Sequence, residues 1–169
     1  MPFRRRPASA RTMLRVFQLV RGQAPDAAFL ADLQFAQQKD LDLSIRIGAL
    51  LAFDALLITA GINPLTASPG APLSLDAPGQ PWESIMVAIG MILLAASSFL
   101  CVRAIMIGEE FSDEGLPEDR DAHERRLLAA YIASIDAQTR LIHVAARITV
   151  IGGLVTGLAC LWILVAKIA

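Results

Sequence analysis

The sequence predicts an all-α integral membrane protein with three transmembrane helices and a cytoplasmic helical extension. The first observation is composition: of 169 residues, 55% are hydrophobic and 18% are charged, and the mean hydropathy is +0.54. Soluble domains have about 45–50% apolar and about 25% charged residues, so a water-soluble fold of this length could not bury so much apolar surface. The second observation is that three segments stay apolar over the roughly 20 helical residues that cross about 30 Å of hydrocarbon.

The three predicted spans cover approximately residues 45–62, 84–107 and 148–165. The first span is expected to continue a polar pre-membrane helix, giving one helix over 26–62. The third is expected to end a long helix over 117–169, about 50 residues or close to 75 Å at 1.5 Å per residue. About 30 residues of that helix project into the cytoplasm at the same rise per residue. Within it, Gly152–Gly153 is the place where an interruption is expected if there is one.

Three shorter segments complete the predicted organisation. Residues 1–25 form a basic amphipathic N-terminal segment, which suits a helix on an anionic inner leaflet; a frayed tail and an organellar transit peptide are the alternatives. Residues 63–83 form a Pro-rich outer loop, expected to be extended because proline removes backbone donors. Residues 108–116 form an acidic turn, which lacks the residue pattern of a calcium-binding loop.

The distribution of Lys and Arg predicts the orientation, because basic residues near span ends stay on the cytoplasmic side. Residues 1–46 hold eight of them, residues 63–83 hold none, and residues 103–147 hold six. We therefore expect a multi-pass protein with a cytoplasmic N-terminus and an external C-terminus. Thirteen Arg against two Lys is typical of a GC-rich bacterial genome, which favours a bacterial inner membrane with a periplasmic C-terminus.

The sequence has no signature of an enzyme or of a cofactor or metal site. It lacks the GxGxxG, phosphate-loop, HExxH and GxSxG patterns, so we expect no catalytic residue and no cofactor. His123 and His143 are too far apart along one helix to share a metal ion. Cys101 and Cys160 lie in apolar runs, which argues against a disulfide or a zinc site. The net charge of −1 argues against nucleic-acid binding.

Asp54 is the most informative residue, because a carboxylate near the middle of a span costs several kcal/mol unless it is protonated, paired or hydrated. Counting inward from the cytoplasmic ends of the other spans places Ser97, Ser98 and Thr156 at a similar depth. We therefore expect an intramembrane polar band of Asp54, Ser97, Ser98 and Thr156. One interpretation is a pore, proton or gating role. The other is a neutral acid in a structural hydrogen bond with a neighbouring helix.

A small-residue motif marks the third span. Gly153 and Gly157 are four residues apart, and such pairs allow helix backbones to approach closely. The spacing indicates a helix-packing surface, and it leaves open whether the partner helix belongs to the same chain or to a second copy.

The layout resembles the Pycsar transmembrane effector family of bacterial cyclic-nucleotide antiphage systems, over roughly residues 28–165. The matching stretches are Leu30–Leu57, a polar helix entering span one, and Tyr131–Gly153, a long helix entering span three. Gln38-Lys39-Asp40 stands where the family has Ala-Asp-x-Lys-Ala, so no nucleotide site is carried over. The resemblance implies antiviral defence, in which an oligomer disrupts the inner membrane on receiving a signal, with a cyclic nucleotide as the candidate signal.

These observations together predict a non-enzymatic inner-membrane protein, an oligomer-forming effector that perturbs the membrane on a signal. The alternative is a passive accessory subunit of a larger membrane complex, because three spans without chemistry suit both roles. The expected partners are the lipid bilayer and either further copies of the chain or the subunits of a membrane complex. A transporter is disfavoured, since three spans leave little room for a substrate path and no inverted repeat is visible.

Overall fold

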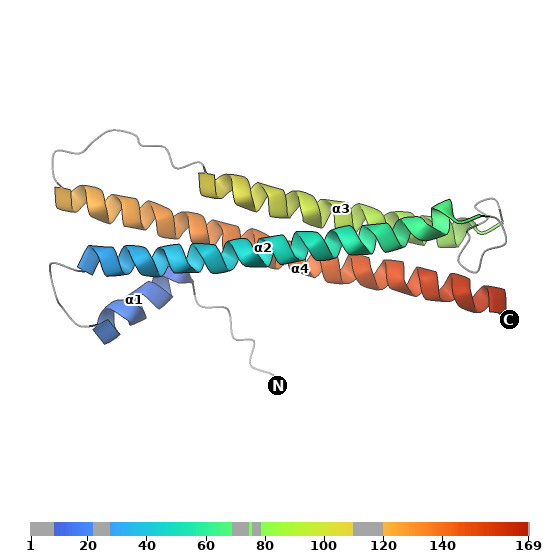
Figure 1. Ribbon diagram of the computed structural model, residues 1–169, viewed down its shortest axis with the longest axis horizontal. Coiled ribbons are helices and arrows are strands. Elements are labelled where there is room, and N and C mark those ends of the chain that lie inside the picture. Colours follow the sequence, from blue (N-terminus) through green and yellow to red (C-terminus); the bar gives the residue numbers. More distant parts are fainter. Residues whose placement is uncertain (1–8, 22–27, 69–74, 76–78, 110–119, 169) are drawn as a thin grey trace. The chain divides into compact units, whose positions relative to one another are not determined.

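The computed structural model describes residues 9–21, 28–68, 75, 79–109 and 120–168, and within these ranges all regular structure is helical. The elements are α1 (Ala10–Arg21), α2 (Ala28–Thr66), α3 (Pro81–Glu109) and α4 (Arg120–Ile168) (Figure 1). Each of α2, α3 and α4 contains a stretch long and apolar enough to cross a membrane. The prediction of an all-α chain with three such helices is therefore confirmed.

The first long helix ends later than the sequence indicates. We expected the outer loop to begin at residue 63, whereas α2 continues to Thr66 with Pro64 inside it. Pro64 lies in the last turn, and its missing N–H removes one helical hydrogen bond. The carbonyl of Pro64 accepts a hydrogen bond from the Leu75 N–H at 2.9 Å. Pro81 opens α3, a position where proline is tolerated because its N–H would have no partner in the helix.

The long C-terminal helix predicted from the sequence is present as α4, which runs through Gly152–Gly153 without a break. The acidic turn was expected to begin at residue 108, but α3 continues through Gly108 to Glu109. Residues 110–119 and the basic cluster at residues 4–6 lie outside the described residues.

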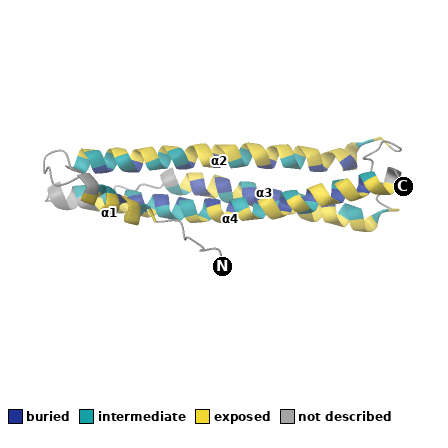
Figure 2. Cartoon of the chain, turned by 90° about the horizontal axis from the view of Figure 1, so that it is seen from below, coloured by how far each residue is buried: buried dark blue, intermediate teal, exposed yellow. Residues whose placement is uncertain are grey.

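The chain divides into two compact units. The first comprises residues 1–46 and 104–140, and the second comprises residues 47–103 and 141–169. Each of the helices α2, α3 and α4 contributes one part to each unit. Buried positions recur along these helices as stripes, with exposed positions between them (Figure 2).

In the first unit, α1 is docked through one of its faces. Leu14 is buried, and the Phe17 ring stacks on Phe35 of α2 with ring centroids 4.9 Å apart. The Asp136 carboxylate of α4 accepts a hydrogen bond of 2.7 Å from the Ala10 N–H at the start of α1. The large apolar side chains Met13, Val16 and Leu19 of α1 stay exposed. That this helix lies on the inner leaflet stays a prediction.

In the second unit, α3 and α4 approach closely at two glycines. A Cβ atom added to Gly90 would overlap the side chain of Thr156 and would lie 3.1 Å from its backbone nitrogen. A Cβ atom added to Gly152 would lie 3.2 Å from the Gly90 carbonyl oxygen. The absence of a side chain at both positions therefore permits this helix–helix contact. A small core of Val87, Ala159 and Ile163 lies nearer the α3 N-terminus.

Candidate functional site

Asp54 of α2 is the centre of a polar cluster in the second unit. Its side chain is 0% exposed. The Thr149 hydroxyl of α4 donates a hydrogen bond of 2.7 Å to Oδ1, and the Ser98 hydroxyl of α3 donates one of 3.2 Å to Oδ2. A single carboxyl group is thus hydrogen-bonded to both other long helices of the unit.

The cluster continues beyond Thr149. The Ser97 Oγ atom lies 2.7 Å from the Thr149 Oγ1 atom and 3.1 Å from the Ala145 carbonyl oxygen. A chain of contacts therefore runs from the Asp54 carboxyl group through two hydroxyl groups to the α4 backbone. We name the side chains of Asp54, Ser97, Ser98 and Thr149 the Asp54 cluster.

The Asp54 cluster has more polar contacts than hydroxyl hydrogens. It contains four contacts: Asp54 with Thr149, Asp54 with Ser98, Ser97 with Thr149, and Ser97 with the Ala145 carbonyl. Each hydroxyl group supplies one hydrogen, so the three hydroxyls supply three. Because Thr149 and Ser98 donate theirs to Asp54, the Ser97 hydrogen is shared between Thr149 and the Ala145 carbonyl.

The four residues of the predicted polar band are not all brought together. Ser98 contacts Asp54 directly, and Ser97 reaches it through Thr149. Thr156 is absent from these contacts; it lies against Gly61 and Gly90. Its hydroxyl is buried without a hydrogen-bond partner among the described residues. Thr149, seven residues earlier on the same face of α4, is the residue that bonds Asp54.

Sequence reasoning placed Thr156 by counting residues from the end of a span, which assumes that every span begins at the same depth. The helix α4 has no break at the start of its apolar stretch. The sequence therefore does not mark the residue at which the span begins, and the depth of Thr156 cannot be counted from it. Helical spacing offered a better signal. Thr149 and Thr156 are two turns apart on one face, so both were candidates for contact with the serines of α3.

The two glycines of the predicted packing motif have different surroundings. A Cβ atom added to Gly153 would lie 3.0 Å from Cδ1 of Leu57, so this glycine faces α2 of the same chain. Gly157 is exposed and has nothing within 4 Å of its Cβ position. The close contact within the chain uses Gly152, which the motif did not include.

The remaining chemically active side chains do not form a site. Among the residues that the structure describes, no group of three His, Cys, Asp or Glu side chains could hold a metal ion. Cys101 and Cys160 are free thiols. His143 is exposed on α4, and the side chain of His123 lies outside the described part of the chain.

Comparisons of the chain with protein-family models, with curated proteins and with solved structures find no match.

Proposed function

We propose that this chain is a multi-pass protein of the bacterial inner membrane that acts without catalysis, as an oligomer-forming effector that perturbs the membrane on a signal. The observation that supports this proposal most directly is the fully buried Asp54 carboxyl group, hydrogen-bonded between three long apolar helices. The proposal has three parts: insertion into the membrane, orientation in it, and a change in the Asp54 cluster when the helices separate.

Membrane insertion is supported by how little of the apolar surface is covered. The most apolar windows of α2, α3 and α4 are only 17%, 28% and 28% buried. Large side chains such as Leu56, Ile92 and Leu154 are each more than half exposed. An exposed apolar surface of this extent requires lipid or other protein to cover it.

The distribution of charges supports the proposed orientation. The segment between α2 and α3 contains no Lys or Arg, whereas six lie between residues 103 and 147 and eight precede residue 47. A cytoplasmic N-terminus and a periplasmic C-terminus satisfy the rule that basic residues remain inside. In this orientation the first unit contains the cytoplasmic helices, where a soluble signal has access.

The effector role rests on the difference between a closed and an open Asp54 cluster. In the observed packing every polar atom of the cluster has a partner within the chain. Separation of the helices would leave a carboxyl group in hydrocarbon, which is costly, unless water or a second copy reached it. An open cluster in an oligomer would therefore be hydrated, and a hydrated polar band across apolar helices provides a route for ions. The closed cluster is the resting state in this proposal.

The same observation favours a second candidate, a passive accessory subunit. A fully satisfied cluster is also what a purely structural hydrogen-bonded link between helices would contain. The two candidates differ in the expected effect of removing the Asp54 carboxyl group. In an effector it changes membrane permeability, and in a subunit it changes only stability.

The experiment is inducible expression in bacteria with a potential-sensitive dye as the readout. High copy number favours oligomers by mass action, so we expect wild type to depolarise the membrane. Asp54→Asn keeps the shape and hydrogen bonding of the side chain but removes its acid, and we expect depolarisation to fall at least fivefold at equal membrane abundance, on the order of 1 kcal/mol. Asp42→Asn, which alters a half-exposed acid of α2 paired with Arg46, is the matched control. Wild type without depolarisation would favour the accessory subunit.

Orientation has its own test. Ser68 lies just after α2 and Ser9 just before α1, and both are exposed. In a parent lacking Cys101 and Cys160, a membrane-impermeant thiol reagent added to intact spheroplasts should label Ser68→Cys and leave Ser9→Cys unlabelled until the cells are lysed. The reverse pattern would invert the proposed topology.

A further inference from the structure

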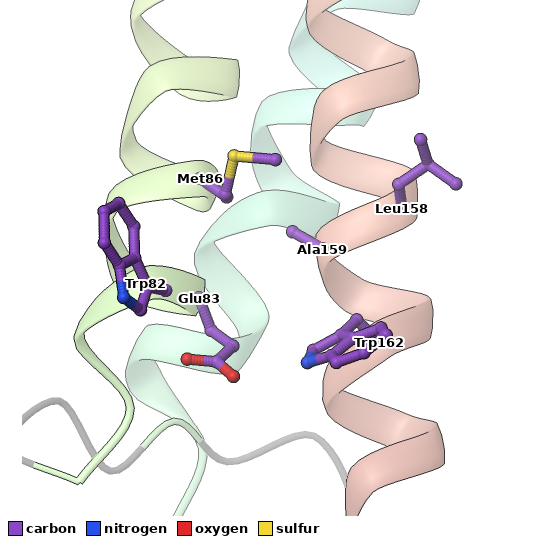
Figure 3. A pocket seen from close by; sticks show the side chains of 6 residues that line it. All are labelled: Trp82, Glu83, Met86, Leu158, Ala159 and Trp162. Atoms are coloured by element: carbon purple, nitrogen blue, oxygen red, sulfur yellow. The ribbon is translucent and has the colours of Figure 1, made fainter.

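A pocket of about 400 Å³ lies between the start of α3 and the end of α4 in the second unit. It is lined by Trp82, Glu83 and Met86 of α3 and by Leu158, Ala159 and Trp162 of α4 (Figure 3). Its volume lies within the roughly 300–1,000 Å³ of small-ligand sites. The Asp54 cluster contributes no residue to it.

The lining residues lie at two levels along the helices, a rim and an inner level. Trp82, Glu83 and Trp162 form the rim, and Figure 3 shows the Glu83 side chain extending into the space between the two indoles. Met86 lies one turn further along α3, and Leu158 one turn back along α4, so the inner level is apolar. The pocket therefore presents a carboxylate flanked by aromatic rings above an apolar slot.

The charge at the rim has no counterpart in the described part of the chain, where no hydrogen bond or ion pair involves Glu83. As an acid in the first turn of α3, it also interacts favourably with the helix dipole, and this alone would explain its position without a ligand. The two tryptophans are not explained in that way, since they remain 76% and 65% exposed beside it. Indole faces attract cations that approach within about 6 Å.

We propose that this pocket binds a phospholipid with an ammonium headgroup, phosphatidylethanolamine, in the outer leaflet. The ammonium group would contact Glu83 between the two indoles, whose N–H groups are donors suited to the lipid phosphate. One acyl chain would occupy the apolar slot of Met86, Leu158 and Ala159. A lipid is favoured over a soluble cation because exposed apolar side chains, Ile89 of α3 and Leu161 of α4, lie within one turn of Met86 and Leu158 along their helices. The inference rests on the proposed membrane insertion and orientation.

The test uses the tryptophan fluorescence of the full chain, because its two tryptophans are the two that line the rim. The protein is reconstituted into vesicles of phosphatidylethanolamine and phosphatidylglycerol, with acyl-brominated quenching lipid of one headgroup at a time. We expect brominated phosphatidylethanolamine to quench with an apparent affinity about two- to fivefold higher than brominated phosphatidylglycerol, as one exposed ion pair between the ammonium group and Glu83 gives. In Glu83→Gln this preference should disappear, and in the control Asp42→Asn it should persist.

The outcomes separate failure of the inference from failure of the proposed function. Equal quenching by the two lipids, or a preference that survives Glu83→Gln, would overturn the lipid site while leaving insertion intact. No quenching by either lipid would show that the rim does not contact the bilayer, which would overturn insertion and the site together. Circular dichroism of each variant, unchanged in helix content, establishes that the loss of preference is not a loss of fold.

Discussion

The two units of this molecule differ in the polar contacts that join their helices. In the first unit they join α1 to its neighbours and are only partly buried: the Gln18 amide donates to Asp32 at 2.7 Å, and the Ala10 N–H donates to Asp136 at 2.7 Å. In the second unit they involve short hydroxyl side chains and one acid, all within apolar helices. Water competes for contacts of the first kind and not for those of the second. The second unit should therefore depend more on each individual contact.

The largest expected effect tests the close approach of α3 and α4. Gly90→Ala adds a Cβ atom that overlaps Thr156 and crowds the α4 backbone, so we expect the free energy of unfolding of the second unit to fall by about 2–3 kcal/mol. Both tryptophans belong to this unit. Thermal unfolding in detergent followed by tryptophan fluorescence is therefore the measurement. A transition unchanged from wild type would contradict the contact.

The next effect concerns the Asp54 cluster. Thr149→Val keeps the side-chain shape but leaves Asp54 Oδ1 without its donor and removes the link to Ser97. We expect a loss of about 1–2 kcal/mol in the same unfolding measurement, since a buried polar group loses its partner. Thr156→Val is the matched control, because the Thr156 hydroxyl has no partner in the described structure. This control should be neutral or slightly stabilising, and equal losses in both variants would remove the cluster's distinct role.

A smaller and more local effect is expected in the first unit. Phe17→Ala removes the ring stacked on Phe35, which should weaken the docking of α1 by about 1 kcal/mol. Hydrogen exchange of α1 backbone amides should accelerate about fivefold, as that free energy implies, while the tryptophan transition stays in place. Val16→Ala, on the exposed face of α1, should leave the exchange unchanged. A shift of the tryptophan transition by Phe17→Ala would show that the units do not unfold separately.

The comparison also explains what could be predicted from the sequence. Hydropathy and the positions of Pro and Gly predicted the four helices, because long apolar runs and helix breakers act locally. Asp54 was identified because a carboxyl group within an apolar span is costly whichever way the helices pack. Its partner Thr149 and the Gly90–Gly152 contact were missed, since they depend on the rotation of each helix about its axis. Pro64 was misjudged, since α2 continues through it to Thr66 although proline removes a helical hydrogen bond.

The smallest effect on stability is expected at Gly157, and this distinguishes packing within the chain from packing between chains. A Cβ atom at Gly157 meets nothing within 4 Å, and isoleucine has a higher helix propensity than glycine by roughly 0.5 kcal/mol. Gly157→Ile should therefore leave the tryptophan transition unchanged or raise it slightly. If Gly157 is instead a contact between copies, the bulky side chain should lower the oligomer fraction seen by mass photometry in mild detergent. A wild type that stays monomeric at every concentration would assign this exposed glycine to lipid contact, and the proposed effector would then need another surface for assembly.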